Sequence, residues 1–122
     1  MQNDQAHAQP MMAAIRLCWE CRDTCQDTLY NHILARGGDH IQADNIRALM
    51  DCIQICQVAA DFMRRNAALH SKTCAACAAI CAACAESCAG MGQEHTTIQH
   101  CADICRQCAA SCHAMSQMGQ AA

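Results

Sequence analysis

Residues 74–88 read CAACAAICAACAESC, a stretch in which five cysteines recur at steps of three or four residues. A second stretch, residues 101–112, reads CADICRQCAASC and has four cysteines at the same steps. Such steps return to one face of an α-helix, because the helix turns once in about 3.6 residues. A bundle helix normally carries Leu, Ile and Val at these positions. The spacing therefore predicts helices that turn a face of thiols towards an interior.

Composition limits the class of protein. The 122 residues include one Pro, five Gly and abundant Ala, which favours one helical domain. The net charge is −3 with acids and bases interspersed, and aromatic residues make up 2%, so we expect no nucleic-acid partner. No apolar run approaches the ~20 residues of a membrane span, which predicts no membrane partner. The polar first ten residues lack the pattern of an export signal, so we expect a cytoplasmic protein.

Helix signals divide the chain into four segments. Pro10 suits a first turn, Gly37 and Gly38 suit a stop, and Asn66 suits the cap of a third helix. We expect helices over about 10–36, 41–65, 66–91 and 97–119. Residues 1–9 are expected to form a disordered tail, and residues 10–122 one four-helix domain.

Short connections make consecutive helices antiparallel, so we predict an all-α fold, an up-down-up-down four-helix bundle with a cysteine-lined core. Between Cys74 and Cys112 the branched aliphatic residues are only Ile80, Ile98 and Ile104, too few for an ordinary apolar core. The expected helices carry three, two, five and four cysteines, which are Cys18, Cys21, Cys25, Cys52, Cys56, Cys74, Cys77, Cys81, Cys84, Cys88, Cys101, Cys105, Cys108 and Cys112.

Several uses of these thiols compete. Packing alone explains one or two buried cysteines, but fourteen in register carry an oxidation liability that Ala or Val would avoid. Disulfides are disfavoured by a reducing compartment and by strict geometry, and a thiol redox buffer would require them. A zinc or iron–sulfur protein with a structural or electron-transfer role is the main alternative. It needs cysteines grouped in fours, and the continuous lining suggests no such grouping.

Cu(I) fits the pattern better. It is soft, prefers thiolate ligands and accepts two or three sulfurs. Sulfurs three or four residues apart on a helix are neighbours, so one ion can bridge them. Burying thiolates without a counter-charge is costly, and each Cu(I) offsets one negative charge. We therefore predict that all fourteen cysteines bind multiple Cu(I) ions.

The chain resembles the cytosolic copper storage proteins, once grouped with ferredoxins. The resemblance covers nearly the whole chain and is carried by DCIQIC at 51–56, ADFM at 60–63, the run at 74–88, HCADICRQC at 100–108, and YNH at 30–32 before Gly37 and Gly38. It implies a four-helix bundle, often tetrameric, whose core stores many Cu(I) ions. The chain departs from the richest members at Ile33 and Ala59, where further thiols would fit.

The two ends of the expected bundle differ. His32 and His100 near the last cysteines are candidate exchangeable metal ligands at one end, which also bears His95 and which we favour as the entrance. The other end would gather Met11, Met63, His70, Met115 and Met118.

Partners and activity complete the expectations. Leu17, Trp19, Leu34 and Ile55 fall outside the inner faces and predict a homo-oligomer. No catalytic motif is present, so we expect no enzyme activity. A storage role would also require a protein that donates or accepts copper.

Overall fold

The structure is a computed structural model that describes the backbone of residues 2–38, 42–92 and 95–118, and the side chains of these ranges from residue 9 onwards. All regular elements in these ranges are helical, as the sequence predicted. Their order is α1 (Gln2–Asp27), the π-helix η1 (Thr28–Ile33), α2 (Leu34–Arg36), α3 (Ala43–Arg64), α4 (His70–Ala89) and α5 (Thr96–Ser116).

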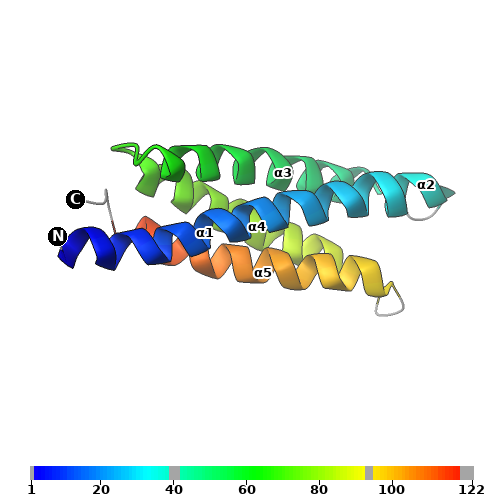
Figure 1. The fold of residues 1–122 in the computed structure, drawn as a ribbon. Helices are drawn as coiled ribbons and strands as arrows, with labels where there is room; N and C mark the ends of the chain where they lie inside the picture. Colours follow the sequence, from blue (N-terminus) through cyan, green and yellow to red (C-terminus); the bar gives the residue numbers. More distant parts are fainter. Residues whose placement is uncertain (1, 39–41, 93–94, 119–122) are drawn as a thin grey trace.

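The helices form an up-down-up-down bundle, which confirms the predicted fold class. Figure 1 shows the start of α1, the α3–α4 turn and the end of α5 at one end, with α2 and the end of α4 at the other. The main contacts join α1 to α3, α3 to α4, α4 to α5 and α5 to α1. Each long helix thus packs against two neighbours, and all four enclose one central core.

Two helix boundaries differ from the prediction. The first helix begins at Gln2, so residues 2–9 are helical where we expected a disordered tail, and Pro10 lies inside the helix. The Ala- and Gln-rich residues before Pro10 favour helix, although the proline removes one backbone hydrogen bond. Asn66 does not cap the third helix, which begins at His70.

Asn66 instead ends the second long helix. Its φ of 50° lies in the left-handed region, which Asn tolerates better than most residues. The Asn66 N–H donates to the Met63 carbonyl at 3.0 Å, and the Ala67 N–H donates to the Phe62 carbonyl at 2.9 Å. These two bonds form a Schellman motif, which satisfies carbonyls at the end of α3.

The π-helix η1 was not predicted. The Leu34 N–H bonds the Leu29 carbonyl five residues earlier, which is one residue more than in an α-helix. The wider turn brings Leu29 and Ile33 into the core at 1% and 0% exposure, while His32 is half-buried. Thr28 is buried as well, at 1% exposure, so the inner face of η1 is formed by Thr28, Leu29 and Ile33.

Cysteine is the commonest residue in the core. Around the cysteines lie Leu49, Ile98 and other aliphatic side chains near the ends of the bundle. Of the apolar residues expected outside the inner faces, Leu34 is 43% exposed, whereas Leu17, Trp19 and Ile55 are half-buried and pack against the core.

Helix α4 is long and apolar enough to cross a membrane by length and composition, with a mean hydropathy of 1.2. This corrects the expectation that no such run exists. Length and composition alone do not identify a membrane span, because the core helix of a bundle has the same length and composition. Here the apolar character comes from Ala and Cys, and every cysteine of the helix is fully buried against its neighbours.

Replacing Leu49 by Ala should lower the free energy of unfolding of the reduced, metal-free protein by about 2–5 kcal/mol, because the side chain is fully buried and leaves a cavity. The adjacent Met50 is 40% exposed, and its replacement by Ala should change stability by about 0.5 kcal/mol or less. Urea denaturation followed by circular dichroism measures both. Equal losses of stability in the two variants would contradict the inward orientation of Leu49.

Candidate metal centre

The fourteen cysteines form one continuous column of sulfur along the bundle axis. All fourteen are free thiols and each has 0% exposure. They reach this column because steps of three and four residues hold them on the inner face of each helix. The structure therefore brings every cysteine singled out in the sequence into the same core.

Sulfurs from different helices lie in contact. Cys18 of α1 and Cys112 of α5 are 3.5 Å apart, at one end of the column. In the middle, the Cys52 sulfur lies 3.6 Å from that of Cys21 and 3.5 Å from that of Cys81, which joins α3 to both of its neighbours. Cysteines of different helices are therefore in contact, and the column is continuous across the helices.

Ten of the cysteines fall into groups of four. In each group the four sulfurs lie within 4.8 Å of one another and every member is buried. The expectation that the thiols would not group in fours is therefore wrong, because it considered each helix alone. The first group is Cys18, Cys77, Cys108 and Cys112; the second is Cys21, Cys52, Cys56 and Cys81; the third is Cys21, Cys25, Cys52 and Cys105; the fourth is Cys56, Cys77, Cys81 and Cys108.

The remaining four cysteines, Cys74, Cys84, Cys88 and Cys101, are buried in the same column. Cys101 lies 3.7 Å from the sulfur of Cys25, so it is continuous with the third group. A soft ion bound by two or three sulfurs could therefore find ligands along most of the column.

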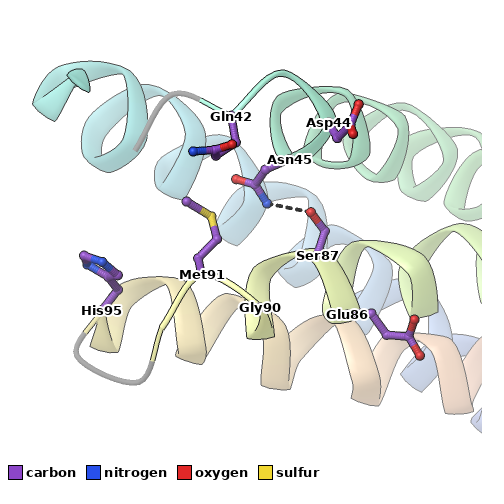
Figure 2. A pocket seen from close by; sticks show the side chains of 8 residues that line it. All are labelled: Gln42, Asp44, Asn45, Glu86, Ser87, Gly90, Met91 and His95. Atoms are coloured by element: carbon purple, nitrogen blue, oxygen red, sulfur yellow. Dashed lines mark hydrogen bonds between the residues drawn. The ribbon is translucent and has the colours of Figure 1, made fainter. Parts of the chain in front are cut away.

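Asn45 is a polar core residue that the sequence analysis missed. It is 3% exposed, and its amide nitrogen donates to the Ser87 hydroxyl at 2.9 Å and towards the Cys88 sulfur at 3.7 Å. Figure 2 shows the bond between Asn45 of α3 and Ser87 of α4. The signal was present, because Asn45 precedes Cys52 by seven residues and so lies on the same helix face.

This asparagine borders a cavity of about 510 Å³ at the end of the bundle where α3 begins and α4 ends. Figure 2 shows Gln42, Met91 and His95 around its opening. The cavity therefore leads from polar surface groups to a side chain that contacts the sulfur column. Its lining residues are Gln42, Asp44, Asn45, Glu86, Ser87, Gly90, Met91 and His95.

The histidines do not lie as predicted. His32 and His95 meet at this end, with ring centroids 6.4 Å apart in an edge-to-face arrangement, and we call this the histidine end. His100 is exposed on the outer face of α5. It directly precedes Cys101, so its side chain points about 100° away around the helix. The expectation that His100 is a ligand at the bundle end is therefore corrected, whereas His95, which was expected at the same end, lies beside His32.

The side chains at the opposite end are buried. Met11, Met63, His70 and Met115 have exposed fractions between 0% and 5%, and we call this the methionine end. The sequence predicted that these residues gather at one end, and the structure adds that they are buried. Met118 is partly buried and packs against the core.

Neighbouring thiols and burial raise the pKa of some cysteines, which therefore stay protonated. The Cys101 thiol, together with burial, raises the pKa of the Cys88 thiol to about 12. The Cys101 and Cys105 thiols, again together with burial, raise the pKa of Cys25. A metal ion must therefore displace a proton from each such thiol that it binds, so binding is favoured by high pH and opposed by low pH.

Comparison with known proteins supports the binding of soft metal ions by these thiols. The sequence profile of the copper storage proteins matches residues 2–117. A protein of Nitrosospira multiformis is 38% identical, with a TM-score of 0.82 over 89% of this chain and 96% of that one. The Cu(I)-bound copper storage protein of Bacillus subtilis is 30% identical, with a TM-score of 0.81 over 88% and 98%.

A third similar structure is a cytosolic copper storage protein of Streptomyces lividans, described with five coppers during copper loading. It is 27% identical, with a TM-score of 0.62 over 93% of this chain and 94% of that one. Among curated protein sequences no match is found.

Raising the pH should remove the stability that the Cys88 thiol contributes to the metal-free protein. The Cys88 thiol, with a pKa of about 12 when folded and near 9.0 when unfolded, holds its proton more tightly in the folded state. Its contribution is present below about pH 9 and is lost as the pH rises towards 12. This thiol alone should cost about 1.4 kcal/mol between about pH 7.5 and pH 10.

Urea denaturation in the presence of a reductant measures this loss. Cys88→Ala is the matched control, because it removes the titrating group from the same position. The variant should lose correspondingly less stability over the same pH interval, and an equal loss would contradict the assignment.

Proposed function

Because the chain belongs to the copper storage protein family, we propose that it binds and stores many Cu(I) ions through the thiolates that line its core. One observation carries this function. Fourteen fully buried free thiols lie in one column, with sulfurs from different helices as little as 3.5 Å apart. No other described part of the molecule offers soft ligands at this density.

Charge explains why the column can take many ions. Each Cu(I) that replaces a thiol proton leaves the core neutral when one thiolate is counted per ion, and adds one negative charge when two are counted. Bridging thiolates, each shared by two ions, keep the ratio close to one. The sulfur–sulfur contacts between helices provide such bridges without long movements of side chains.

The ligands are the fourteen cysteines, among which the ten grouped ones form the most compact part. Storage of a soft ion requires binding and release but no reaction, so the storage role of the family calls for no enzyme activity. A cytoplasmic location is supported by the relative from Streptomyces lividans, which is described as cytosolic. In that compartment the thiols stay reduced and ready to bind.

Copper enters and leaves at the histidine end. The cavity of about 510 Å³ opens there, with His95 and Met91 on its rim and Asn45 at its contact with the column. Imidazole and thioether are neutral, exchangeable ligands for Cu(I). At the methionine end the side chains of Met11, Met63, His70 and Met115 are buried, which favours the histidine end as the entrance. A protein that donates or accepts copper would dock at this opening.

The chain also forms a homo-oligomer through the outer faces of the segment from α1 to α2 and of α3. Support comes from Leu34, which is 43% exposed, and from a shallow groove of about 260 Å³ that includes Ile55, Val58 and Ile80. Such apolar surface is typical of an interface. The column lies inside one bundle, so each copy would keep its own copper store.

Anaerobic titration of the reduced protein with Cu(I), against a competing chelator, should saturate at more than seven ions for each chain. Fourteen thiolates shared two to an ion hold seven, and bridging raises this number. Saturation at one or two ions would contradict storage. Replacing Cys77 by Ser should lower the capacity only slightly, because its neighbours remain.

Replacing His32 and His95 together by Ala should slow copper uptake or release several-fold and leave the capacity nearly unchanged. Stopped-flow transfer between the protein and a chromogenic chelator measures both. His100→Ala is the matched control, because this histidine is exposed away from the column. Unchanged rates in the double variant, with altered rates after removal of Met63 and Met115, would place the entrance at the methionine end.

A further inference from the structure

The grouping of the sulfurs in fours is not required by Cu(I). This ion is satisfied by two or three sulfurs, whereas four sulfurs at the corners of a tetrahedron are the ligands of a closed Zn²⁺ site. The four groups defined above bring four buried sulfurs together from at least two helices. Their presence raises the question of whether the distances suit a tetrahedral ion.

The third group can be compared with the required geometry. A tetrahedral ion with metal–sulfur bonds of about 2.3 Å needs sulfurs about 3.8 Å apart. The Cys21 sulfur lies 3.6 Å from Cys52 and 3.8 Å from Cys105, and the Cys105 sulfur lies 3.6 Å from Cys25 and 4.0 Å from Cys52. Four edges of this tetrahedron thus have the required length before any ion is bound.

Shared cysteines limit how many groups are filled at once. The second and third groups share Cys21, and the first and fourth share Cys77. Groups that share no cysteine are the first with the second, the first with the third, and the third with the fourth. The column therefore holds at most two closed four-sulfur sites at the same time.

The geometry points to a second metal specificity: the reduced, copper-free bundle binds two divalent ions of the zinc type, each in a closed site of four thiolates. This inference goes beyond copper storage and does not depend on it. Binding of one Zn²⁺ to four thiols releases up to four protons and leaves a site with a charge of −2. Because that charge is buried, the zinc form is weaker than the copper form, in which one Cu(I) can offset each thiolate. Cu(I) should therefore displace the zinc.

Co²⁺ is the probe, because four thiolates around this ion give intense visible absorption and a sulfur-to-cobalt charge-transfer band. Titration of the reduced protein under anaerobic conditions should show a break at two ions for each chain. Added Zn²⁺ should abolish the absorption, and Cu(I) added to the zinc form should release zinc to a chromogenic chelator. A wild-type protein without thiolate-to-cobalt absorption, or zinc that stays bound with Cu(I), would overturn the proposal.

Variants separate the closed groups from unspecific binding to many thiols. Cys21→Ser removes the second and third groups, and the two that remain share Cys77, so one ion should bind. Cys25→Ser removes only the third group, so two ions should still bind. A cobalt capacity that is the same in both variants would overturn the proposal.

The double variant Cys21→Ser with Cys77→Ser removes all four groups and should lose the cobalt absorption. It keeps twelve of the fourteen cysteines, so its Cu(I) capacity should stay close to that of the wild type. Copper capacity thus reports folding and storage, while cobalt absorption reports the closed groups. Loss of cobalt with copper retained supports the inference, and cobalt retained in this variant refutes it.

Discussion

Contact between neutral thiols from four helices is the interaction on which this bundle depends. Sulfurs 3.5–4.0 Å apart fill the interior, and every cysteine is fully buried. In this arrangement a thiol behaves as a small apolar group and packs as Ala or Val would. The same atom becomes a charged ligand once a metal ion replaces its proton. Core and binding site are therefore one set of atoms, and what stabilises the empty protein also sets the capacity of the filled one.

This double role explains how the rest of the molecule is built. Few polar side chains form hydrogen bonds in the described core. One of them, Asn45, lies where the column meets the cavity at the histidine end. Ordinary aliphatic packing is kept for the bundle ends, as at Leu49 and Ile98. Ile33 and Ala59, which are fully buried, occupy core positions that carry no thiol. The number of cysteines could thus change at such positions without a change of fold.

The sequence predicted the bundle because the cysteine spacing records the inner face of each helix. It could not predict which sulfurs meet, since the distance from Cys18 to Cys112 depends on the rotation and stagger of α1 and α5, which no local pattern encodes. The π-helix η1 could not be predicted either. Leu29 and Ile33 are four residues apart, and this step places two side chains on one face in α-helices and π-helices alike. The error at Asn66 has another cause, because Asn suits both the start of a helix and the left-handed position after its end. Pro10 was placed in a first turn, but the residues before it also favour helix. The error at His100 could have been avoided, because its neighbour Cys101 was already predicted to face inwards.

The difference between the two ends has a consequence for how a store of this kind is emptied. Buried side chains line the methionine end, whereas the cavity that includes His95 lies at the histidine end, where His95 meets His32. With the histidine end as the entrance, the ions deposited first lie deepest and the latest arrivals leave first, as in a stack. The readiness with which metal is surrendered would then reflect the few sulfurs nearest the opening and not the average strength of the column. A half-filled store and a full one would differ in their response to the same acceptor, even with identical ligands throughout.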